Sequence, residues 1–62
     1  MSAVDVKFAA ECEKVHRRAM ENWREGKPVK VWKDESGNLC IEYESGRWWH
    51  YRRAENGEIE WW

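Results

Sequence analysis

A tripeptide that occurs three times places the strongest constraint on how this chain can fold. Glutamate, then serine or asparagine, then glycine occupies residues 35–37, 44–46 and 55–57. In a three-residue hairpin loop the last residue takes a left-handed conformation, which glycine adopts without a Cβ penalty. The segments around each tripeptide alternate apolar and polar residues with a period of two. The second half of the chain is therefore predicted to form four antiparallel strands at residues 29–34, 39–43, 47–54 and 58–62.

Residues 2–25 have a different period, which predicts one helix. Apolar residues recur every three or four positions and draw a single stripe: Val4, Phe8, Cys12, Val15, Ala19 and Trp23. Ser2 and Asp5 fit a capping box at the start of this helix, and Gly26 suits the left-handed position that follows a helix. Pro28 cannot continue it. Packing on another surface must supply most of its stability.

The loop length sets the strand register, because residue pairs can be counted outwards from each turn. This count sets Val31 opposite Ile41, and Ile41 opposite Trp49, on one face of the sheet. The same face gains further apolar pairs, namely Val29 beside Tyr43, Leu39 beside Tyr51, and Tyr51 beside Trp61. Trp23, Trp49 and Trp61 are predicted to lie in the core. We thus expect a two-layer α+β fold, in which one N-terminal helix covers a four-stranded antiparallel meander in sequential order.

The count leaves a row of aromatic residues on the opposite face of the sheet. The row contains cross-strand neighbours in the order Trp32, Cys40, His50 and Trp62, with Trp48 one step away opposite Glu42. One helix can cover only one face, so this row stays open to solvent. A contiguous exposed strip of three tryptophans is typical of a binding surface. These six residues are predicted to bind a partner.

The charge of the chain bears on what that partner is. Lys and Arg number 11 against 12 Asp and Glu, which gives a net charge of −1. On the aromatic face and its rim, two cations stand against five carboxylates: Lys30 and Arg52 against Asp34, Glu42, Glu44, Glu58 and Glu60. RNA-recognition modules stack bases on exposed aromatics of a four-stranded sheet, but this charge would repel phosphates. The face suits a protein better.

We therefore expect a non-enzymatic protein-binding module. It would act by homodimerisation, or by docking as an accessory or inhibitor protein on a larger partner with a basic surface. One alternative is a single-stranded nucleic-acid binder that stacks bases on the same face. Another is a stand-alone or designed scaffold without a ligand, in which the cross-strand rings only stiffen the sheet.

Two cysteines and two histidines raise chemical possibilities that the pattern disfavours. Cys40 beside His50 resembles a nucleophile with its base, but a flat sheet offers no concave site or oxyanion hole. Cys12 and His16 lie one helical turn apart, and together the two pairs would make a zinc ligand set. The predicted register separates them by about the thickness of the sheet, although two copies of the Cys40 and His50 pair could meet in a symmetric dimer. No catalytic residue, metal or other cofactor is predicted.

The distribution of apolar residues bears on the compartment. No apolar run approaches the length of a membrane span or of a signal-peptide core, and the N-terminal segment carries charges throughout. We expect no membrane association. A cytoplasmic location with both cysteines reduced follows as an expectation.

Overall fold

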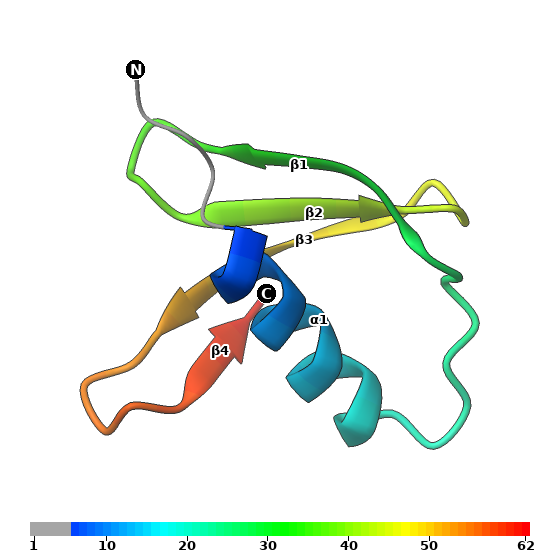
Figure 1. The fold of residues 1–62 in the computed structure, drawn as a ribbon, viewed down its shortest axis with the longest axis horizontal. Coiled ribbons are helices and arrows are strands. Elements are labelled where there is room, and N and C mark those ends of the chain that lie inside the picture. Colours follow the sequence, from blue (N-terminus) through cyan, green and yellow to red (C-terminus); the bar gives the residue numbers. More distant parts are fainter. Residues whose placement is uncertain (1–5) are drawn as a thin grey trace.

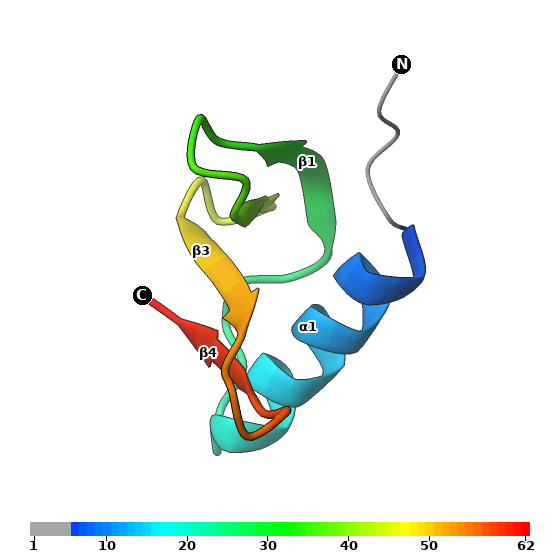
Figure 2. The ribbon, with the colours of Figure 1, turned by 90° about the vertical axis from the view of Figure 1, so that its left-hand side faces the viewer.

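The computed structural model describes residues 6–62, which form one helix and four strands (Figure 1). In chain order these are α1 (Val6–Ala19), β1 (Pro28–Lys33), β2 (Leu39–Tyr43), β3 (Trp48–Arg53) and β4 (Ile59–Trp61). The strands form one antiparallel sheet in the order β1-β2-β3-β4. Figure 2 shows α1 on one side of the twisted sheet, close to β4. The predicted α+β meander with one N-terminal helix is confirmed.

The three tripeptide loops adopt the predicted conformation. Their glycines, Gly37, Gly46 and Gly57, have φ angles of 85°, 89° and 88°. In the first hairpin, Asp34 N donates to Asn38 O at 3.0 Å, and Gly37 N donates to Asp34 O at 3.0 Å. The other two hairpins repeat both bonds. Three residues thus close each turn, and this fixes the register of the flanking strands.

The strand pairs agree with the counted register except at one position. The register includes the predicted pairs Val31 with Ile41, Trp32 with Cys40, Leu39 with Tyr51, Cys40 with His50, Ile41 with Trp49, Glu42 with Trp48, and Tyr51 with Trp61. The prediction of Val29 beside Tyr43 is wrong, because the register shifts between Pro28 and Lys30 and Tyr43 pairs with Pro28. Val29 is the extra residue of this bulge, and it is 59% exposed rather than part of the core.

The predicted strand boundaries are close to the observed ones. β2 coincides with residues 39–43, and the other three strands differ by one residue at each end. Ends of this kind are set by the last ladder hydrogen bonds, which residue periodicity does not resolve. Among residues 6–62 the structure contains no helix with the length and apolar character needed to cross a membrane.

The predicted end of the helix is wrong. α1 ends at Ala19 rather than at residue 25. Met20 N donates to Arg17 O at 3.2 Å, which is the shorter hydrogen-bond spacing that often tightens a last helical turn. The predicted start at residue 2, with its capping box of Ser2 and Asp5, lies outside the described residues.

Trp23 reaches the core because the chain leaves the helix before it. Its indole Nε1 donates to Gly26 O at 2.8 Å, and its ring lies 5.0 Å from that of Tyr43 between centroids. Gly26 has the predicted left-handed φ, 80°, but it does not cap the helix. The side chain of Glu44 crosses it, and a Cβ on Gly26 would lie 2.5 Å from Glu44 Oε1. This glycine therefore permits a close crossing in the link between α1 and β1.

The core lies between α1, the link that follows it and the inner face of the sheet. Its buried residues are Ala9, Cys12, Leu39, Ile41, Tyr43, Tyr51 and Ile59, with Trp23, Trp49 and Trp61 packed against them. The three tryptophans predicted for the core thus lie there. The buried face of α1 follows Ala9, Cys12 and His16, so it is rotated from the predicted stripe, and Ala19 is exposed.

Candidate functional site

The face of the sheet opposite α1 carries a continuous row of rings, Trp32, Trp48, His50 and Trp62, which we call the outer strip. Its ring centroids are 5.3 Å apart between Trp32 and Trp48, and 4.9 Å apart between Trp48 and His50. His50 and Trp62 stack with centroids 4.9 Å apart and planes only 3° from parallel. Trp48 is 48% exposed and Trp62 is 49% exposed. A partner would therefore meet two half-open indoles supported by neighbouring rings.

A cation lies over the ring at each end of the outer strip. Lys30 Nζ is 5.4 Å from the centroid of Trp32, and Arg52 Cζ is 5.5 Å from that of Trp62. Arg52 also pairs with Glu60, with 2.8 Å between Nε and Oε1. These contacts restrain the terminal rings in the unbound chain, so a partner would immobilise fewer rotamers on binding.

The two remaining predicted contact residues, Cys40 and Glu42, are less exposed than the sequence predicts. Cys40 has no exposed surface, and Glu42 is half-buried. Glu44 is engaged within the chain, where its Oε1 accepts a hydrogen bond from Lys27 N at 2.7 Å. Burial therefore leaves Cys40 unable to contact a partner and Glu42 only partly accessible to one.

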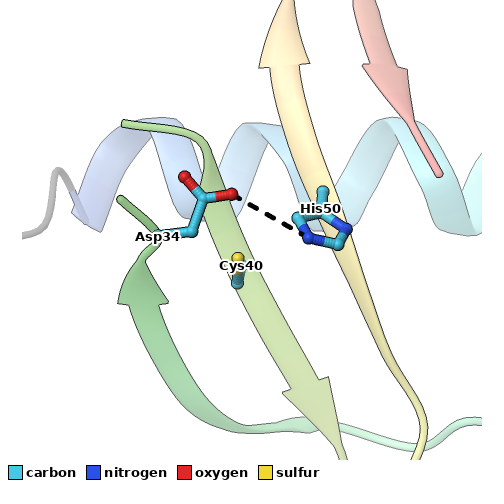
Figure 3. Close-up of side chains that lie close together, drawn as sticks. All are labelled: Asp34, Cys40 and His50. Carbon is cyan, nitrogen blue, oxygen red and sulfur yellow. Dashed lines mark ion pairs between the residues drawn. The ribbon is translucent and has the colours of Figure 1, made fainter. Parts of the chain in front are cut away.

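Asp34, Cys40 and His50 converge at the edge of the outer strip (Figure 3). One potential ligand atom from each lies within 4.8 Å of the others. Cys40 and His50 are the predicted cross-strand pair of β2 and β3, whereas Asp34 follows β1 and was expected only on the rim. The sequence signal for Asp34 was its place before a hairpin loop, where an aspartate often bonds to the backbone of the turn.

The environment of the cluster disfavours a cysteine nucleophile. Burial raises the pKa of Cys40, and the nearby Asp34 carboxylate adds to the rise. The pKa of Asp34 is lowered, chiefly by the hydrogen bond from the backbone N–H of Asn38. A catalytic thiol needs a stabilised thiolate and access for its substrate. Cys40 is fully buried and lacks that access.

Sequence reasoning missed the histidine of the inner face. His16 has no exposed surface, and its Nδ1 lies 2.7 Å from the hydroxyl of Tyr51, which lies 2.7 Å from that of Tyr43. If Tyr43 donates to Tyr51 and Tyr51 donates to Nδ1, both hydroxyl protons are used and His16 Nε2 carries the ring proton. Among residues 6–62 this Nε2 has no hydrogen-bond partner.

The rings around His16 explain its charge state. Trp61 stacks on it with centroids 4.5 Å apart, and Trp23 and Trp49 meet it at steep angles with centroids 4.9 and 4.8 Å away. Burial among these rings lowers the pKa of His16, so the ring stays neutral near pH 7. His16 follows Cys12 by four residues and Ala9 by seven, a spacing that places all three on one helix face and indicates burial. His16 was not assigned to the core from the sequence because histidine is polar.

The structure thus separates two groups on or near the outer face. The outer strip gathers four of the six predicted contact residues into one row, and the polar cluster adds Asp34 beside Cys40 and His50. Comparison with models of protein families, with curated proteins and with solved structures finds no match to this chain. The geometry of these two groups is therefore the basis for a function.

Proposed function

We propose that this chain is a non-enzymatic protein-binding module whose outer strip packs against a second copy of the chain. The observation that carries this proposal is the pair of half-exposed indoles, Trp48 and Trp62, on a continuous row of rings. Tryptophan is strongly enriched among residues that dominate binding energies, and burying one at a contact can contribute about 2 kcal/mol or more. An uncovered row of this kind favours a partner that supplies another apolar face.

The charges around the outer strip favour a second copy as that partner. Lys30 lies opposite Glu42 at one end and Arg52 pairs with Glu60 at the other, so each end of the strip carries charges of both signs. A face that carries charges of both signs can match the same face of a second copy across a twofold axis. Two sheets that pack face to face lie about 10 Å apart, a gap that interdigitated indoles can fill.

A shallow surface hollow lies at the β4 edge of the sheet, next to the last ring of the outer strip. It is lined by Arg52, Ile59, Glu60, Trp61 and Trp62. Of its lining residues, Arg52, Glu60 and Trp62 also border the outer strip, so a second copy that covers the strip lies next to this hollow. A ring seated in a neighbouring recess is the usual arrangement of a binding hot spot.

Sedimentation velocity over a range of concentrations tests the proposal. We expect the wild type to dimerise, and the double variant Trp48→Ala with Trp62→Ala to be a folded monomer by circular dichroism. Met20→Ala is the matched control, because Met20 is also an exposed apolar residue, at 41%, but lies beyond α1 rather than on the outer face. A wild type that stays monomeric, or a double variant that associates as the wild type does, contradicts the proposal.

The same samples separate this proposal from nucleic-acid binding. A base-stacking surface would bind a labelled single-stranded oligonucleotide, with an affinity that falls steeply as salt rises. We expect no such binding, since the chain carries a net charge of −1. Salt-dependent binding by a monomeric wild type would favour the nucleic-acid function instead.

A further inference from the structure

We propose that Asp34, Cys40 and His50 form a binding site for a divalent transition-metal ion, of which Zn²⁺ is the best match. Their donor atoms are a carboxylate oxygen, a thiol sulfur and an imidazole nitrogen, all within 4.8 Å of one another. These are the three donor types that zinc takes in proteins. The site goes beyond protein binding and does not require the dimer.

The orientation of His50 is the first argument for a cation. Its Nδ1 lies 3.3 Å from the carbonyl oxygen of Trp62, which can only accept a hydrogen bond. Nδ1 therefore carries a ring proton, which leaves Nε2 as the ring nitrogen that faces Asp34. Histidines that bind metals commonly donate their other N–H to a backbone carbonyl in this way.

The carboxylate of Asp34 is held in place to face that lone pair. Its Oδ1 accepts hydrogen bonds from the backbone N–H groups of Ser36 and Asn38 at 3.0 and 2.8 Å. Its Oδ2 accepts one from the Asn38 side chain at 3.2 Å and lies 3.9 Å from His50 Nε2. Oδ2 and Nε2 thus face each other across a short gap, in which a cation can bind to both atoms.

Cys40 supplies the third donor from beneath the other two. Figure 3 shows its sulfur below the dashed line that joins the Asp34 carboxylate to the His50 ring. Its described polar contact is weak, with 3.9 Å between Sγ and Asn38 O. Metal binding forms a metal–sulfur bond and releases the thiol proton to solvent.

The surroundings of the cluster leave room for entry and for a further ligand. The side chains of Asp34 and His50 are 27% and 28% exposed, so an ion can approach from solvent although Cys40 is buried. Three protein ligands fill three of the four positions that zinc prefers. Water can take the fourth.

Titration of the reduced chain with Co²⁺ tests this site. We expect tetrahedral cobalt bands in the visible and a thiolate-to-cobalt band in the near ultraviolet, saturating at one ion per chain and displaced by Zn²⁺. Cys40→Ser should remove the thiolate band. Asp34→Asn, which keeps the turn acceptor, and His50→Gln should each weaken binding at least about tenfold. Cys12→Ala is the control that removes the other thiol and should leave the bands unchanged.

Measurements on the wild type make the test independent of whether the variants fold. Zn²⁺ should shift the ¹⁵N resonance of His50 Nε2 and leave both nitrogens of His16 unchanged. Absence of a thiolate band, loss of the band in Cys12→Ala, or no shift at His50 would overturn the site, as would Asp34→Asn with unchanged affinity. Trp48→Ala should weaken dimerisation but retain cobalt binding, so failure of one proposal is distinguishable from failure of the other.

Discussion

The two faces of the sheet each hold a histidine among tryptophan rings, yet the two residues are solvated differently. His16, on the inner side, is fully buried, and its Nδ1 lies 2.7 Å from the hydroxyl of Tyr51. His50, on the outer side, stacks on Trp62 and directs Nε2 towards a carboxylate that is 27% exposed. Both rings lie within 5 Å of a tryptophan ring between centroids. Residue type and aromatic neighbours therefore do not separate a structural histidine from a candidate ligand.

Access to polar partners is what separates the two histidines. His16 makes its described hydrogen bond to the buried hydroxyl of Tyr51, which in turn bonds to that of Tyr43. Among residues 6–62 no charged group forms a hydrogen bond with His16. Burial keeps it neutral, so it acts as a core ring. His50 lies beside Asp34 and Cys40 at an open edge, where an ion can enter. The outer face accordingly carries both proposed functions.

The largest expected effect comes from adjacent tryptophans on opposite faces. Trp49→Ala should lower the free energy of unfolding by about 3 kcal/mol, because the ring packs against the core and its loss leaves a cavity. Trp48→Ala should lower it by about 1 kcal/mol or less, because this ring is half-exposed. Urea unfolding at a concentration below that of dimer formation measures both. Equal losses would show that the two faces are not distinct.

Alkaline pH should destabilise the inner face next most strongly. Burial raises the pKa of Tyr43 to about 12 and also raises that of Tyr51. In the unfolded chain both ionise near pH 10, so unfolding releases protons above that pH and stability falls by up to about 1.4 kcal/mol per pH unit for each tyrosine.

These two tyrosines are the whole tyrosine content of the chain, which makes the measurement clean. Tyrosinate absorbance in the near ultraviolet should stay low above pH 10 while the protein remains folded, and should rise together with unfolding. Tyrosinate that forms near pH 10 in the folded protein would contradict the buried hydroxyl pair.

A smaller effect is expected at acid pH from His16. Its pKa is lowered in the folded chain, so the unfolded chain binds more protons below about pH 6.5. The contribution of neutral His16 to the free energy of unfolding is therefore complete above that pH. It is lost as the pH falls, by at most about 1.4 kcal/mol per pH unit. The pKa of Asp34 is lowered too, but this carboxylate matters only below about pH 4.

Urea unfolding between pH 7 and pH 5 isolates this contribution. His16→Asn, which keeps an acceptor for Tyr51, should remove the loss of stability on acidification. His50→Gln is the matched control and should retain it. A pH dependence that follows His50 instead would reverse the roles assigned to the two histidines.

Much of the sheet was predictable, because local rules determine it. The glycine of each tripeptide and the alternation around it predicted the loop conformation, the strand order and the register of nearly every pair. The exception is the bulge at Val29. Residue pairs are counted outwards from the turn, and Val29 lies far from it, so its predicted partner depends on every pair in between.

The candidate site was predictable only in part. The register predicted that Trp32, Trp48, His50 and Trp62 share one face, since strand residues alternate between faces. It did not predict that Asp34 turns its carboxylate towards His50, because that depends on the hydrogen bonds of the turn. It also did not predict that Cys40 has no exposed surface, because neighbouring side chains cover it.

The sequence by itself determined the hairpins and the division of the tryptophans between two faces, because turn geometry and a period of two act over a few residues. Only the tertiary structure decided where α1 ends, that His16 is buried, and which donors meet around Cys40. Each of these depends on side chains from segments far apart in the chain, as when Trp23 leaves the helix to pack on Tyr43. Packing of that kind overrides helical periodicity, because the buried rings contribute more than the extra helical turns.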